Sequence, residues 1–116
     1  MDNRVNKYLQ DILTAIDEIW FFMESRPREY AVFCEDLLFR RGVERNIEIM
    51  GEAMNKALKL NPELPITNSR KIVDTKNFVI HAYDSLKPDL LWGIVINHLP
   101  LLRKEIEAIL NNGIDF

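Results

Sequence analysis

The stretch NRVNKYLQDILTAIDEIWFFM, residues 3 to 23, decides the fold class. Its apolar residues recur in steps of three, four and one, which places them on a single stripe of a helix. They are Val5, Tyr8, Leu9, Ile12, Leu13, Ile16, Ile19, Trp20 and Met23. Ser25-Arg26-Pro27 ends this helix, because Pro27 lacks a backbone N–H and pushes its predecessor away from helical angles.

The same periodicity predicts a second long helix from about Glu35 to Leu60, preceded by a short helical turn from Glu29 to Phe33. Its inward positions are Val43, Ile47, Met50, Met54 and Leu58. Gly42 and Gly51 weaken a helix by about 1 kcal/mol each relative to alanine, unless their small size lets another helix approach closely.

Two further helices complete the chain. The first runs from Arg70 to Tyr83, with Asn68 or Ser69 as its cap. The second begins at Pro88, where a missing N–H costs nothing, and runs to about Leu110. Pro100 lies inside it and predicts a kink near Ile96 or Asn97. The apolar residues of these two helices are Ile72, Val73, Val79, Ile80, Leu91, Ile94, Val95, Leu99, Leu102, Ile106 and Ile109.

These segments predict an all-α fold, an antiparallel four-helix bundle with one extra short helix, formed as a single domain over residues 1–116. No alternating pattern typical of strands is present. The aromatic residues exceed what one small core needs, and we therefore predict a homodimer that pairs through helices. The aromatic residues in question are Trp20, Phe21, Phe22, Phe33 and Trp92.

Composition narrows the function classes. A formal net charge of -3 argues against a globally basic nucleic-acid coat, so a phosphate site must be a local patch such as Arg70, Lys71, Lys76 and Lys87. Cys34 is the single cysteine, which excludes an internal disulfide and a cysteine metal cage and suits a cytoplasmic location. No apolar run approaches about 18 residues, so we expect no membrane span.

The segment KNFVIHAY, residues 76 to 83, gathers a cation, an amide, an imidazole and a phenol on one short helical stretch. Asn77 and His81 lie one turn apart on one face, and Lys76 and Tyr83 follow a neighbouring line. Phosphate chemistry needs a cation for charge and a group that titrates near neutrality for proton transfer. The pattern therefore makes Lys76, Asn77 and His81 candidate catalytic residues.

Each of these residues also has a structural interpretation. His81 is typical of a histidine that interacts with the last carbonyls of a helix. Lys76 and Asn77 suit a solvated helix surface, and Tyr83 suits a core aromatic whose hydroxyl points outward. His98, beside Pro100, we interpret as a packing or surface residue, and neither histidine has a carboxylate at metal-ligand spacing. We predict no metal site and no cofactor.

The chain resembles the HEPN toxins of the HepT type, the DUF86 group, over nearly its whole length. No single segment is specific, but the order and spacing of several are. They are YLQDIL (8–13), ERNIEIMGEA (44–53), SRKIV (69–73), KN with HAYD (76–84), and NHLP (97–100). We interpret Arg45 with Glu48 and Glu52 within this pattern as a structural ion-pair ladder, because their spacing allows contacts along one helix face.

The resemblance implies a metal-independent endoribonuclease that cleaves RNA such as tRNA at a cleft between two copies of the chain. The family signature is an arginine, four to six residues, and a histidine, often followed by a tyrosine two positions on. The chain matches at Asn77, His81 and Tyr83 and departs at Lys76, which stands where the family has arginine. The resemblance also implies a partner, a minimal nucleotidyltransferase (MNT) antitoxin, which would adenylylate Tyr83.

RNA cleavage without metal needs a base for the ribose 2′-OH, an acid for the leaving oxygen and a cation for the phosphate. Two copies of His81 in one dimer cleft would supply base and acid. Lys76 would neutralise the phosphate, helped by Arg70 and Lys71. Asn77 would orient His81 or the phosphate, and Tyr83 would stack on a base or hydrogen-bond the RNA backbone. Two other functions remain open: a non-catalytic nucleotide- or partner-binding module weakened as a nuclease by Lys76, and a plain helical dimerisation domain.

Overall fold

The computed structural model describes the backbone of residues 2–81 and 88–112, and the side chains of residues 2–75 and 88–112. Over these ranges the chain is helical apart from its connections and has no strand. The helices are α1 (Asn3–Glu24), α2 (Tyr30–Glu35), α3 (Leu37–Leu60), α4 (Ser69–His81), α5 (Pro88–Gly93), the π-helix η1 (Ile94–His98) and α6 (Leu99–Asn112). The predicted all-α class is confirmed.

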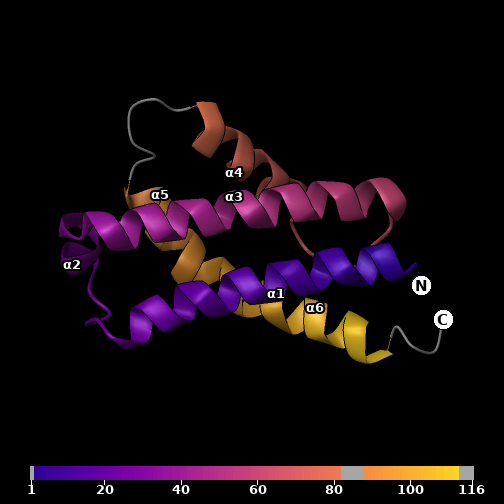
Figure 1. Ribbon diagram of the computed structural model, residues 1–116, viewed down its shortest axis with the longest axis horizontal. Coiled ribbons are helices and arrows are strands. Elements are labelled where there is room, and N and C mark those ends of the chain that lie inside the picture. The colour runs from indigo at the N-terminus through magenta and orange to yellow at the C-terminus, as the bar shows by residue number, and fades with distance from the viewer. Residues whose placement is uncertain (1, 82–87, 113–116) are drawn as a thin grey trace.

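Helix α3 is the central element of the bundle. It packs along α1 on one side and along α4 on another, and α5 and α6 lie behind α1 and α3 (Figure 1). α1 begins and α6 ends at the same end of the bundle, while α2 closes the opposite end. α4 rises from the bundle toward the α2 end, so the helix that carries the polar motif is also the most peripheral of the long helices.

The predicted apolar stripes form the core. Val43, Ile47, Met50, Met54 and Leu58 are all buried, as are six of the nine α1 positions. The other three, Tyr8, Leu13 and Trp20, pack half-buried against the same core. Burying one large apolar side chain stabilises a fold by about 1.5–3 kcal/mol, so this shared core is the main source of stability.

The predicted kink at Pro100 takes the form of a π-helical turn. Residues Ile94–His98 form η1, and the N–H of Leu99 donates to the carbonyl of Ile94, five residues back instead of four. Proline removes one N–H from the ladder and its ring crowds the preceding turn, and a wider turn relieves both. The expected single helix from Pro88 is therefore divided into α5, η1 and α6.

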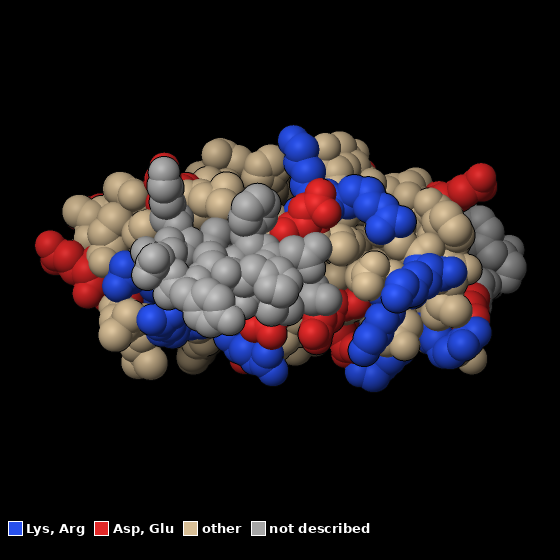
Figure 2. All heavy atoms as spheres, turned by 90° about the horizontal axis from the view of Figure 1, so that it is seen from above, with Lys and Arg blue, Asp and Glu red and all other residues tan. Residues whose placement is uncertain are grey.

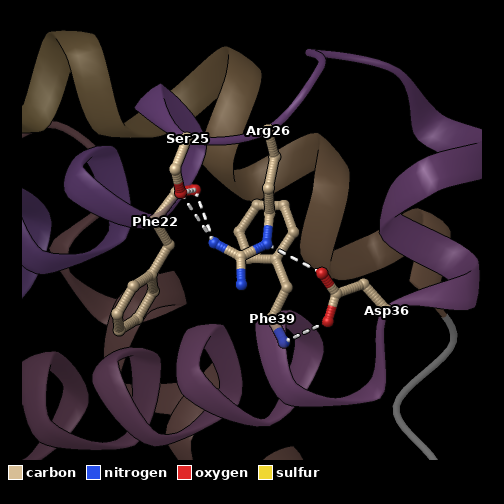
Figure 3. Close-up of polar contacts among 5 residues, drawn as sticks. All are labelled: Phe22, Ser25, Arg26, Asp36 and Phe39. Atoms are coloured by element: carbon tan, nitrogen blue, oxygen red, sulfur yellow. Dashed lines mark hydrogen bonds and ion pairs between the residues drawn. The ribbon is translucent and has the colours of Figure 1, made fainter.

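The boundary between α2 and α3 lies at Asp36, one residue inside the helix that the sequence pattern predicts. Asp36 Oδ1 accepts from the N–H of Phe39 at 2.9 Å and so caps α3 (Figure 3). Asp36 Oδ2 pairs with Arg26 Nε at 2.7 Å, and Arg26 Nη1 also donates to the carbonyl of Phe22 at 2.9 Å. The Arg26 hydrogen bond, aided by the Phe39 N–H, lowers the pKa of Asp36.

The aromatic residues that suggested a dimer are mostly used within the protomer. Phe33 is fully buried, with its ring centroid 5.1 Å from that of Phe39 and 5.2 Å from that of Trp92. The prediction that Phe33 exceeds what the core of one protomer needs was therefore wrong. Trp20 lies under the guanidinium of Arg103 at 5.3 Å. Of the five residues only Phe21 is highly exposed, at 68%. Only the fold shows which aromatic side chains are buried, because the exposure of each side chain depends on how the helices pack.

Gly42 lets α1 approach α3 closely. A Cβ at this position would lie 2.7 Å from Cε2 of Phe22, closer than real Cβ atoms come to a neighbour. Gly93 is the contrasting case, because it has helical angles (φ -59°, ψ -41°) and a Cβ there would meet nothing within 4 Å. The expectation that a small residue permits close helix packing is confirmed at Gly42.

The two glycines predict opposite effects of substitution by alanine. Gly93→Ala should raise the free energy of unfolding by about 1 kcal/mol, because alanine favours helical angles and no neighbour is displaced. Gly42→Ala should lower it by up to about 2 kcal/mol, because displacing the Phe22 ring outweighs the same gain. Urea denaturation measures both. Phe22→Leu should reverse the sign at Gly42, and equal stabilisation at both glycines in the wild-type background would contradict the close packing.

Candidate functional site on helix α4

The start of α4 is held by a strained residue. Asn68 has φ of 60°, in the left-handed region that asparagine tolerates better than most residues. From there its carbonyl accepts from the N–H groups of Lys71, at 3.0 Å, and Ile72, at 3.3 Å. Asn68 therefore starts the helix through its backbone, and Ser69 is the first helical residue.

The connection before α4 is fixed to α6 by one carboxylate. Glu105 accepts from the backbone N–H of Thr67 at 3.1 Å and from the Thr67 hydroxyl at 2.9 Å. The two residues are 38 positions apart in the chain. Hydrogen bonds to an ionised group are stronger than neutral ones, so this contact sets where α4 begins relative to α6.

The backbone of α4 is helical without interruption from Ser69 to His81, which places Lys76, Asn77 and His81 on one helix as predicted. The helical register puts Arg70 on the stripe of Asn77 and His81, because eleven residues make close to three turns. The side chains of Lys76, Asn77 and His81 lie outside the described residues. Tyr83, Asp84 and Lys87 lie outside them altogether.

The two predicted phosphate-binding residues at the start of α4 separate onto different sides of the helix. Arg70 and Lys71 are both exposed. Lys71 lines a cavity between α4 and α6, whereas Arg70 does not. Figure 2 shows Lys and Arg side chains on both sides of the grey area, interspersed with acidic ones. The basic patch is therefore discontinuous over the part of this face that the structure describes.

The cavity beside Lys71 has a volume of about 60 Å³ and is bounded by α3, α4, η1 and α6. Its walls are mainly apolar: Ile47, Met50, Ile72, Ile94, Leu99 and Leu102. Lys71, Thr75 and His98 also line it. His98 is exposed and ends η1, which agrees with its interpretation as a surface residue. The sequence contained the relevant residues, in SRKIV and NHLP, but gave no sign that they border one cavity.

The exposed side of α3 carries paired charges near its start. Arg41 Nη1 lies 3.1 Å from Glu44 Oε2, and Arg45 Nη1 lies 3.4 Å from Glu48 Oε1. The second pair confirms the first rung of the predicted ladder. Such exposed pairs contribute about 0–1 kcal/mol, so they shape the surface charge more than the stability.

No three His, Cys, Asp or Glu side chains among the described residues are grouped as a metal site requires. None of the helices in the described part of the chain has the length and apolarity to cross a membrane.

The described chain is an all-helical bundle with a polar, His-containing motif on a peripheral helix, and one known protein family matches it over most of its length. The family model described as Ribonuclease HepT-like matches residues 7–109. The chain therefore belongs to the HepT-like ribonuclease family. No solved structure was found to match it.

Named relatives align over almost their entire length. "Putative RNase MJ1380" of Methanocaldococcus jannaschii is 29% identical over 106 residues, which cover 90% of this chain and 95% of that protein. "Probable ribonuclease HepT" of Thermococcus cleftensis is 32% identical over 106 residues, covering 88% of this chain and 92% of that protein. The similarity to these two proteins therefore extends over most of the helical bundle.

Proposed function

We propose that the protein is a metal-independent endoribonuclease and the toxin of a toxin–antitoxin pair. The observation that carries the proposal is the family match over residues 7–109, which spans an α4 that is helical through all three candidate catalytic positions. Lys76, Asn77 and His81 are the proposed catalytic residues. Arg70, Lys71 and Tyr83 are the proposed contacts to the RNA.

In the proposed reaction the ribose 2′-OH loses its proton and attacks the adjacent phosphorus, and the leaving 5′-oxygen gains a proton. One copy of His81 acts as base and the copy from a second protomer acts as acid. Lys76 offsets the charge that develops on the phosphate oxygens. Asn77 orients the imidazole or the phosphate. Arg70, which lies on the same stripe of α4, contacts the neighbouring nucleotide.

The reaction requires a dimer, and the exposed apolar residues suggest where it forms. Leu38 is 76% exposed and Phe21 is 68% exposed, and Leu37, Leu90 and Tyr30 are also exposed. They belong to α1, α2, α3 and α5, which meet at the end of the bundle toward which α4 rises (Figure 1). A second copy docked at this α2 end would cover apolar surface and bring two α4 helices together.

The remaining parts of the proposal follow from the family resemblance. The protein would act in the cytoplasm, and an MNT-type nucleotidyltransferase would be its antitoxin. That enzyme would adenylylate Tyr83, which lies two positions after His81. An adenylyl group adds negative charge and bulk beside the catalytic imidazole, so the modification would block RNA binding.

One feature favours a second candidate function. Lys76 stands where the family has arginine, and lysine lacks the planar fork that binds a phosphate through two hydrogen bonds. The alternative is a non-catalytic nucleotide- or partner-binding module that acts with the nucleotidyltransferase. It predicts stable co-purification with that partner and no RNA cleavage even at high protein concentration.

The nuclease proposal predicts that purified protein cleaves RNA in the presence of EDTA. His81→Ala should reduce the cleavage rate by about 10²–10⁴-fold, because general acid–base catalysis contributes that much. Gel analysis of labelled tRNA and total RNA measures the rate. Asn97→Ala, an exposed polar change on η1, is the matched control and should cleave normally. Equal cleavage by wild type and His81→Ala would reject the assignment.

Restoring the family residue separates the two candidate functions. Lys76→Arg should raise the cleavage rate about tenfold, because a second charge-assisted hydrogen bond to the phosphate is worth on the order of 1.4 kcal/mol. Lys104→Arg on α6 controls for a general effect of arginine. If neither the wild type nor Lys76→Arg cleaves RNA while both bind the nucleotidyltransferase, the binding module is the correct function.

The proposed dimer face predicts that Leu38→Glu shifts the protein from dimer to monomer. A charge placed in an apolar interface remains unpaired and is costly to bury. Multi-angle light scattering after size-exclusion chromatography measures the mass. Leu60→Glu, at the opposite end of α3, should leave the dimer intact. A dimer that persists in Leu38→Glu and in Phe21→Glu would place the interface elsewhere.

A further inference from the structure

Helix α4 is held against the bundle mainly from one side. Among the described residues its extensive contacts are with α3, whereas α1 packs on both α3 and α6. Val73 is buried, and Ile72 packs half-buried against the core. The cavity of about 60 Å³ lies on the side of α4 that faces η1 and α6. Apolar contacts are not directional, so the interface with α3 holds α4 in place without fixing its tilt.

One polar contact ties the start of α4 to a second helix. Each carboxylate oxygen of Glu105 on α6 accepts from the backbone N–H of Thr67 at 3.1 Å, and one of them accepts from the Thr67 hydroxyl at 2.9 Å. No other side-chain hydrogen bond or ion pair joins residues 67–75 to the rest of the described chain. Asn68 follows Thr67, and its carbonyl accepts the first hydrogen bonds of α4. The contact therefore lies where the chain turns into the helix.

We propose that Glu105 is a positioning residue for the catalytic stripe of α4, and that it acts through Thr67. The inference rests on the proposed function, because it concerns the geometry of the proposed catalytic residues. Glu105 does not touch the RNA in this arrangement. Its carboxylate fixes the direction in which α4 leaves the preceding loop, since hydrogen bonds to an ionised group are strong and depend on direction.

The position of His81 is sensitive to the direction of α4. His81 lies twelve positions after Ser69, the first residue of the helix. At about 1.5 Å per residue, His81 is about 18 Å from the start of α4, and a tilt of roughly 10° there would move it by about 3 Å. A misplacement of about 1 Å can cost a reaction about 10²-fold. A small change at the start of α4 is therefore enough to affect catalysis.

The contact contributes more to geometry than to stability. Thr67 is exposed and Glu105 is half-buried, so water competes for their hydrogen bonds. Leu64 and Ile66 are buried, and these two side chains hold the loop before α4 on the core. Loss of the Glu105 carboxylate should therefore leave the bundle folded and change the direction of α4. A purely structural role would instead lower stability and activity together.

The test compares two carboxylates of α6. Glu105→Ala should lower kcat for RNA cleavage about tenfold with little change in KM, because tenfold is the usual loss for one charge-assisted hydrogen bond. Glu107→Ala is the matched control, because Glu107 pairs with Arg103 Nε at 2.9 Å, on its own helix. It should cleave like wild type, and both variants should have the same urea midpoint.

Variants of Thr67 check that Glu105 acts through this residue. Thr67→Val removes the hydroxyl and keeps the backbone N–H, so it should lower kcat by less than Glu105→Ala does. Thr67→Ser keeps both donors and should restore the wild-type rate. The double variant Glu105→Ala with Thr67→Val should be no slower than Glu105→Ala alone, because both changes remove the same contact.

NMR spectroscopy measures the geometry without any need for cleavage. In ¹H–¹⁵N spectra of the full chain, the amide signals of Asn77 and His81 should shift in Glu105→Ala and stay in place in Glu107→Ala. If the wild type cleaves no RNA but these shifts occur, the nuclease proposal fails and Glu105 still positions α4.

The opposite results overturn the inference and leave the nuclease proposal intact. They are an active wild type whose kcat is unchanged in Glu105→Ala, or an equal loss of rate in Glu105→Ala and Glu107→Ala. A lower rate with a lower urea midpoint and unshifted α4 signals also overturns it, because that combination indicates a general loss of stability. Absence of the NMR shifts in a protein that cleaves no RNA overturns both proposals.

Discussion

The structure depends on α3 being buried along two of its sides at once. Gly42 and Phe22 bring α1 close on one side, and Ile47 and Met50 face the cavity beneath α4 on another. Burial of these sides contributes the apolar free energy that holds three long helices together. The position of α4, and hence of the backbone at Lys76, Asn77 and His81, follows from this packing. A change that moves α3 would move the site as well.

Two polar connections then fix how the helices are joined. Asp36 caps α3 and pairs with Arg26, which also binds the carbonyl of Phe22 near the end of α1. Glu105 holds Thr67 and so the start of α4 against α6. Apolar contacts are not directional and allow helices to slide, whereas these hydrogen bonds are satisfied only in one arrangement. They therefore define geometry more than they add stability.

The helix α4 has two chemically different sides at its start. Arg70 shares the register of Asn77 and His81, while Lys71 lines the cavity with Thr75 and His98. Adjacent cations in the sequence thus lie on two sides of α4, Arg70 on the proposed catalytic stripe and Lys71 beside the cavity. The cavity lies between α4, which packs on α3, and the segment formed by η1 and α6.

The sequence by itself determined the all-α class, most inward residues of α1 and all those predicted for α3, and the position of the kink before Pro100. Those properties depend on periodicity and on the missing N–H of proline, which are local. Only the tertiary structure decided that Phe33 is core, that Asp36 separates α2 from α3, and that Lys71 and His98 line one cavity. Those facts depend on contacts between residues far apart in the chain, and no local pattern encodes such distances. The roles of Lys76, Asn77, His81 and Tyr83 stay predictions from the motif, because their side chains lie outside the described residues.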